Sequence, residues 1–164
     1  MFGAQTAWVT LVTEDPAAFF AAEGSDLPLG FFRIASLILI VVFAGLWWIL
    51  LRSVDTSRIR HTALWWLIGG IGAVALPYIL GNSNDYRLIL LLTALAGALL
   101  WRGAGGPALP LWVFAGLVAL VNATNAWMIP NSAGWFMPKA AVLLGDLALM
   151  VVIAFGAALL LRAW

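Results

Sequence analysis

Long apolar runs separated by short polar stretches occupy most of this chain, and their lengths suit membrane-spanning helices. A helix needs about 20 residues to cross the hydrocarbon core of a bilayer, within a range of about 17–25. Charged and turn-forming residues divide the chain into five runs, which we predict to be transmembrane helices over residues 34–51, 62–81, 86–101, 110–129 and 140–161. The predicted fold class is therefore an all-α integral membrane protein, with a segment 1–33 ahead of a helical bundle 34–164.

The third run is the shortest of the five. Only residues 88–101 are purely apolar, and Asp85, Tyr86 and Arg87 stand directly before them. The run reaches the length of a full crossing only if these three residues lie in the headgroup layer. We therefore predict that the tripeptide marks the membrane boundary.

The segment 1–33 is predicted to lie outside the membrane core. Its apolar start, residues 1–12, has no basic flank, so it indicates neither a cleavable signal peptide nor a span. Pro16 can open a short helix that shows Phe19 and Phe20 to the lipid interface. We expect an interfacial linker here rather than a lid over a pocket.

Basic residues predict the orientation in the membrane. The loop between the first two runs is rich in arginine, and short loops of this kind stay in the cytoplasm. With that loop inside, Arg52, Arg58, Arg60, Arg102 and Arg162 face the cytoplasm, whereas Arg33, Arg87 and Lys139 face outward. The prediction is a multi-pass protein of the bacterial inner membrane, with its N-terminus outside and its C-terminus in the cytoplasm.

Composition agrees with the membrane and excludes several classes of function. The 164 residues are 65% hydrophobic and 9% charged, whereas about a quarter of a soluble domain is charged. The net charge of +1 provides no basic surface for nucleic acid, and the lack of cysteine removes thiolate metal sites. The single histidine, His61, reads as a solvated loop residue, although a lone histidine can hold a haem or chlorin metal. We predict no metal site and, with no nucleotide-binding or hydrolase motif, no enzymatic activity.

Ten tryptophans are present, and most of them fall near the ends of the predicted runs. An amphipathic ring prefers the headgroup layer, so we interpret these residues as interface anchors. The anchors that we single out, with one tyrosine, are Tyr86, Trp101, Trp112 and Trp135. No cofactor is predicted and membrane lipids are the expected ligands; a pigment or quinone pocket is the alternative.

Small residues in the second and third runs predict close helix packing. GGIGA begins at Gly69 and ALAGA at Ala94, and small side chains at such spacing let two helices approach. The linker GNSND is short, so we expect the two helices to form an antiparallel hairpin.

Asp146 is the one acidic residue well inside a run. It lies seven positions after Lys139, which places it roughly 10 Å from the outer boundary at about 1.5 Å per residue. We predict an outer-half polar cluster made of Asp85, Arg87, Asn122, Asn125 and Asp146. Either these groups pair with one another and hold the helices together, which we favour, or they bind an anionic lipid headgroup with Arg87 on the phosphate.

One stretch resembles a known family. The run WWLIGGIGAVALPYILGNSNDYRLILLLTAL, residues 65–95, is similar to a segment in the C-terminal half of polyprenol-phosphate-sugar-dependent glycosyltransferases of the GT-C class, of the alpha-mannosyltransferase type. In that family a glycine-bearing helix precedes a GNxxDYRLIFLL-like segment, which is matched here by Gly81, Asn82, Asp85, Tyr86, Arg87 and Leu88.

The resemblance implies a structural role for the tripeptide at a helix start. Asp85 would lie near the positive end of the helix dipole, Tyr86 in the interface and Arg87 among the headgroups. The family's catalytic acid lies in an early outer loop, and the residues around Glu14 and Asp15 do not match that loop. The chain therefore looks like the C-terminal membrane portion of such a transferase, without its catalytic loop.

We interpret the chain as a non-catalytic accessory or structural subunit of a larger bacterial membrane complex, whether respiratory, photosynthetic or glycan-building. Its expected partners are membrane lipids and other membrane subunits, and not nucleic acid. The alternative is a truncated or partner component of a lipid-linked-sugar glycosyltransferase that binds polyprenyl phosphate. A transporter is disfavoured because the polar cluster occupies one half of the membrane and no inverted repeat is visible.

Overall fold

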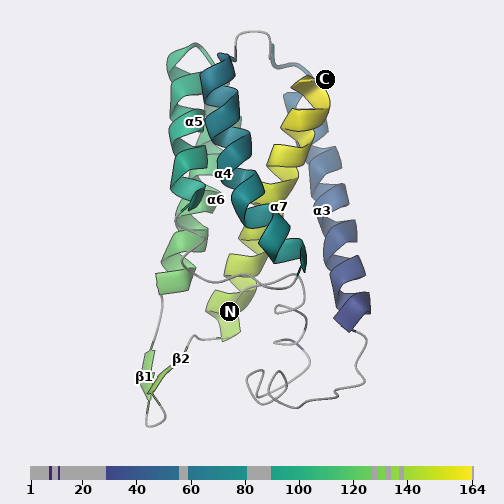
Figure 1. The fold of residues 1–164 in the computed structure, drawn as a ribbon, viewed down its shortest axis with the longest axis vertical. Coiled ribbons are helices and arrows are strands. Elements are labelled where there is room, and N and C mark those ends of the chain that lie inside the picture. Colours follow the sequence, from purple (N-terminus) through teal and green to yellow (C-terminus); the bar gives the residue numbers. More distant parts are fainter. Residues whose placement is uncertain are drawn as a thin grey trace.

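Five helices and one short pair of strands make up the described part of the protein (Figure 1). The computed structural model describes residues 8, 11, 29–55, 59–80, 90–126, 129–131, 134–136 and 139–163. In chain order the elements are α3 (Leu29–Leu51), α4 (His61–Leu80), α5 (Leu91–Gly103), α6 (Ala108–Ala126), β1 (Ile129–Asn131), β2 (Gly134–Phe136) and α7 (Lys139–Ala163). The helical character predicted from the apolar runs is confirmed.

The helices form an up-and-down bundle around α7 (Figure 1). α7 packs against α3, α6 and α4, while α4 and α5 form a tightly packed pair. About 67% of the apolar stretch of α7 is buried inside the protein, against 28% for α3 and 33% for α4. The last helix of the chain is therefore the core of the bundle, and α3 is an outer helix.

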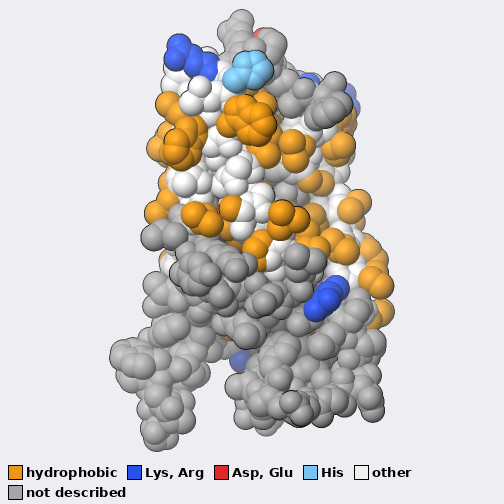
Figure 2. All heavy atoms as spheres, in the orientation of Figure 1, with side chains coloured by type: hydrophobic (Ala, Val, Ile, Leu, Met, Phe, Trp, Pro, Cys, Tyr) orange, Lys and Arg blue, Asp and Glu red, His pale blue; other side chains and the backbone are white. Residues whose placement is uncertain are grey.

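Three of the described helices are long and apolar enough to cross a membrane, over Arg33–Leu51, His61–Ile79 and Lys139–Arg162. Two further apolar helices, Leu91–Gly103 and Ala108–Thr124, are shorter. Figure 2 shows hydrophobic side chains across the described part of the face in view, with basic side chains and the histidine at its upper end and further basic side chains lower down. The apolar surface and the three long apolar helices are compatible with a membrane protein.

Some helix bounds differ from the predicted spans. α3 begins at Leu29, directly after Pro28, although its apolar stretch long enough to cross a membrane is Arg33–Leu51, close to the predicted span 34–51. The fourth helix ends at Ala126, and Ile129 lies in β1, where it pairs with Phe136 of β2. Pro130 is the middle residue of β1; proline has no backbone N–H to donate and would clash inside a continuing helix, so a strand pair replaces the predicted last turn.

Some of the small residues of α4 and α5 lie where the two helices touch. A Cβ atom at Gly70 would stand 2.5 Å from the backbone nitrogen of Ala94. Gly69 and Gly72, by contrast, have open space beside them. The predicted hairpin is confirmed, and its contact face runs through Gly70 rather than through the other glycines of GGIGA.

Candidate functional site

The buried acid of α7 is the first candidate site. The side chain of Asp146 is fully buried, and it lies seven residues into a helix that starts at Lys139. Among the described residues the other buried polar side chains are Ser36 of α3 and Thr124 of α6. The depth predicted for Asp146 therefore corresponds to a position inside the bundle and not on its lipid-facing surface.

Tyr78 of α4 accompanies Asp146 in the core, and the sequence pattern did not single it out. The phenol is fully buried, and it interacts electrostatically with the carboxyl group of Asp146. Within the described part of the chain, its hydroxyl oxygen has no hydrogen-bond partner. Tyr78 lies two residues before the end of α4, a position at which the sequence suggests an interface anchor. Its place in the core becomes clear only from the way α4 crosses α7.

The side chains of Asn122 and Thr124 in α6 donate hydrogen bonds to backbone carbonyls of their own helix. The Asn122 Nδ2 atom donates to the carbonyl oxygen of Val118 at 2.8 Å. The Thr124 hydroxyl donates to the carbonyl oxygens of Leu120 and Val121, at 2.9 and 3.0 Å. Bonds to the preceding turn remove the cost of burying these groups without a ligand. Because these bonds run within α6, they do not pair the predicted cluster residues with one another across helices.

The rest of the predicted polar cluster lies outside the described residues. This applies to Asp85 and Arg87, and also to the side chain of Asn125, whose backbone lies one residue before the end of α6. The predicted anchor Tyr86 lies outside the described residues as well. The five-residue cluster therefore stays a prediction. The motif of the family resemblance, residues 81–88, falls in the same gap.

The predicted interface anchors have different surroundings. Trp112 of α6 is 62% exposed on the surface of the bundle. Trp101 of α5 is fully buried instead, because the chain turns after α5 and the backbone nitrogen of Gly106 donates to the Trp101 carbonyl at 2.9 Å. The absent side chain of Gly106 leaves room for the indole, since a Cβ there would stand 2.7 Å from the Trp101 Cδ1 atom. Trp135 belongs to β2, and its side chain is outside the described set.

Trp47, another tryptophan expected at the interface, also lies inside the bundle. Its indole nitrogen donates to the carbonyl oxygen of Val151 on α7 at 3.2 Å. Its ring meets Phe155 edge to face, with centroids 4.8 Å apart. Trp47 therefore holds the outer helix α3 against the central helix α7.

A second contact joins α3 and α7 at the upper end of the bundle. The Arg162 guanidinium donates to the carbonyl oxygen of Leu51 at the end of α3, and it lies 5.8 Å from the centroid of the Trp48 ring. A cation at a helix C-terminus satisfies a free carbonyl and the helix dipole together. At the lower end, the Trp8 indole donates to the Ser36 hydroxyl at 2.9 Å, so Trp8 contacts α3.

Metal ligands do not gather in the described residues, which hold no group of three or more His, Cys, Asp and Glu side chains. His61 is exposed at the first position of α4. Comparison with protein-family models, with curated proteins and with solved structures gives no match for this chain.

Proposed function

We propose that this protein is a non-catalytic accessory subunit that packs sideways against another subunit of a larger membrane complex. The observation that carries the proposal is the outward surface of α3. One narrow stripe of α3, made of Ser36, Ile40, Trp47 and Leu51, is buried in the bundle. The remaining surface is exposed and apolar, through Ile34, Leu37, Ile38, Val41, Val42, Leu46, Ile49 and Leu50.

Gly45 gives that outward surface a point of close approach. It is exposed in the middle of α3, and a Cβ atom built on it meets nothing within 4 Å. Helix pairs in membranes approach most closely at small residues, because lipid offers no hydrophobic force to drive them together. A partner helix crossing at Gly45 would contact Val41 and Ile49, one turn away on either side.

The orientation proposed for the subunit places the arginine-rich end in the cytoplasm. In the described residues, one end of the bundle carries Arg52, Arg60, Arg102 and Arg162, and the other carries Arg33 and Lys139. An excess of arginine next to short connections is typical of the cytoplasmic side. This asymmetry supports a multi-pass protein of the inner membrane with its C-terminus inside.

Photo-crosslinking in native membranes tests the accessory role. A photoreactive side chain at Val41 should form one discrete adduct with another membrane protein, and Gly45→Leu should abolish that adduct while the helical content is retained. The matched control is the same photoreactive group at Leu76, which is equally exposed on α4. Equal adducts from both positions, or none from Val41, would contradict the proposal.

An activity assay addresses the transferase alternative. We expect the purified protein to transfer no sugar from polyprenyl phosphate. Transfer that is lost on Asp15→Asn would replace the accessory role with an enzymatic one.

A further inference from the structure

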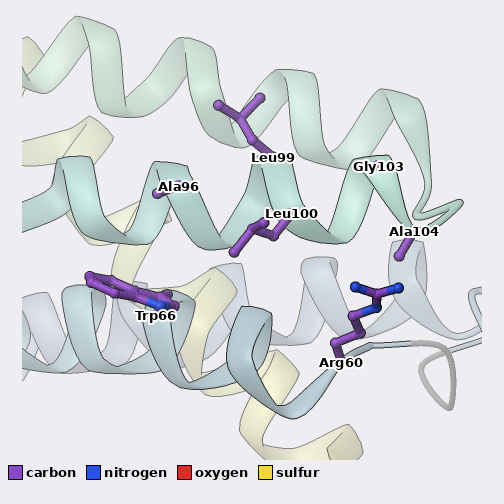
Figure 3. A pocket seen from close by; sticks show the side chains of 7 residues that line it. All are labelled: Arg60, Trp66, Ala96, Leu99, Leu100, Gly103 and Ala104. Atoms are coloured by element: carbon purple, nitrogen blue, oxygen red, sulfur yellow. The ribbon is translucent and has the colours of Figure 1, made fainter.

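A groove of about 690 Å³ opens on the outer side of the α4–α5 pair, at the arginine-rich end (Figure 3). Arg60 lies at its mouth, just before α4 begins, and the guanidinium extends toward Gly103 and Ala104 at the end of α5. Trp66 and Leu100 line the groove farther along the two helices, away from their arginine-bearing ends. The volume is in the range of ligand pockets, about 300–1,000 Å³. The groove therefore combines one cation with otherwise apolar or backbone walls.

A second hollow continues the first along the same helix pair. It measures about 300 Å³, shares Trp66 with the groove, and reaches Gly69, Gly70 and Thr93. The space beside Gly69 is open, since a Cβ there would meet no other atom within 4 Å. From Arg60 to Gly69 is nine residues, or roughly 14 Å at about 1.5 Å per residue. That is close to half of the hydrocarbon core of about 30 Å, which is the depth of one leaflet.

Arg60 is available for a ligand. Its side chain is exposed, and it makes no hydrogen bond or salt bridge to any residue that the structure describes. A guanidinium presents a rigid fork of donors that matches a phosphate and binds it with two charge-assisted hydrogen bonds. The cation lies at the end of the hydrophobic helix α4, which is the level of lipid phosphates when the helix crosses a bilayer.

We propose that this groove binds an anionic phospholipid of the leaflet that meets the arginine-rich end. The lipid phosphate binds Arg60, and one acyl chain follows the α4–α5 surface past Trp66 to Gly69. The anionic headgroup of such a lipid matches the charge at the mouth of the groove. Its acyl chain matches the apolar strip, which is about as long as one leaflet is deep. The residues that line the two hollows come from α4, α5 and their ends, and none comes from α3, so the site is independent of the subunit contact proposed on α3.

Lipid titration of the purified full-length protein, followed by native mass spectrometry, tests the site. Wild type should bind phosphatidylglycerol more tightly than phosphatidylcholine, and Arg60→Gln should weaken phosphatidylglycerol binding by at least about tenfold, as expected for loss of hydrogen bonds to a charged group. Arg60→Lys should retain part of the affinity. Arg52→Gln is the matched control: it removes an exposed arginine at the same end but outside the groove, so binding should not change.

A second variant tests the apolar part of the groove with Arg60 intact. Ala96 is exposed and lines the groove, so Ala96→Phe should fill it and weaken binding to a similar degree without changing the helical content. Inorganic phosphate at millimolar concentration should not displace the lipid. Equal losses in Arg60→Gln and Arg52→Gln, unchanged binding in Ala96→Phe, or displacement by phosphate alone would each overturn the proposal.

Discussion

Gly97 of α5 lies directly against the backbone of α4 at Leu67. A Cβ atom at Gly97 would stand 2.6 Å from the Leu67 backbone nitrogen and 2.7 Å from the Ala63 carbonyl oxygen. Both neighbours are main-chain atoms of a helix, so neither can turn aside as a flexible side chain would. The approach of α4 to α5 therefore depends on the absence of one side chain.

Gly97→Ala should lower the free energy of unfolding by about 1–3 kcal/mol, the usual cost of forcing extra volume into a packed contact. Gly72→Ala is the control, because a Cβ at Gly72 meets open space. It should be neutral or gain up to about 1 kcal/mol from helix propensity. Reversible unfolding in mixed detergent micelles measures both values, and equal stability of the two variants would contradict the contact.

Trp47→Phe should cost about 0.5–1.5 kcal/mol, because it removes the indole donor to Val151 but keeps an aromatic ring against Phe155. Trp47→Ala should cost more, about 3–5 kcal/mol, since the ring contact is lost as well. The control is Trp65→Phe at a ring that is 73% exposed, where no change is expected. If Trp47→Phe and Trp65→Phe had the same effect, the bond to α7 would contribute nothing.

Asp146→Asn should leave the fold intact, because an amide of the same shape keeps hydrogen-bonding capacity and removes a charge from the core. Asp146→Leu should destabilise the protein by about 1–3 kcal/mol, since it loses every polar contact of the carboxyl group. Thermal unfolding and assembly in native membranes report both effects. Loss of assembly in a well-folded Asp146→Asn protein would show instead that the charge itself is needed.

Tyr78→Phe should leave the free energy of unfolding unchanged or raise it by as much as about 3 kcal/mol. The substitution removes a buried hydroxyl for which the described residues offer no hydrogen-bond partner. The ring itself stays in place. Combining it with Asp146→Asn gives the coupling energy between the two residues in a double-mutant cycle. A destabilised Tyr78→Phe protein would mean that the hydroxyl makes a bond in the membrane.

Cysteines introduced at Ser57 and Ser132 should react with a membrane-impermeant reagent from opposite sides. The natural chain has no cysteine, so the labelling background is clean. Position 57 belongs to the arginine-rich connection and should be labelled only in inverted vesicles, whereas position 132 should be labelled in intact cells. Labelling from the same side would refute the five-span topology.

The sequence by itself determined the class of fold and where most helices lie, because bilayer thickness links apolar length directly to a crossing helix. It also determined the small-residue pairing of α4 with α5, since a short linker leaves an antiparallel hairpin as the simplest arrangement. The helix end at Ala126 was missed because a short strand pair depends on contacts between residues on both sides of a turn.

Only the tertiary structure decided which apolar residues are inside. In a membrane chain both the lipid-facing and the core-facing surfaces are hydrophobic, so hydrophobicity along the chain does not separate them. Trp101 and Trp112 look alike as end-of-run tryptophans, yet the first is buried under a folded-back turn and the second is exposed. For the same reason, the sequence did not predict that Tyr78 lies beside Asp146 or that a groove lies next to Arg60. Both features result from how the helices cross, and the crossing is set by the shapes of facing side chains rather than by their polarity.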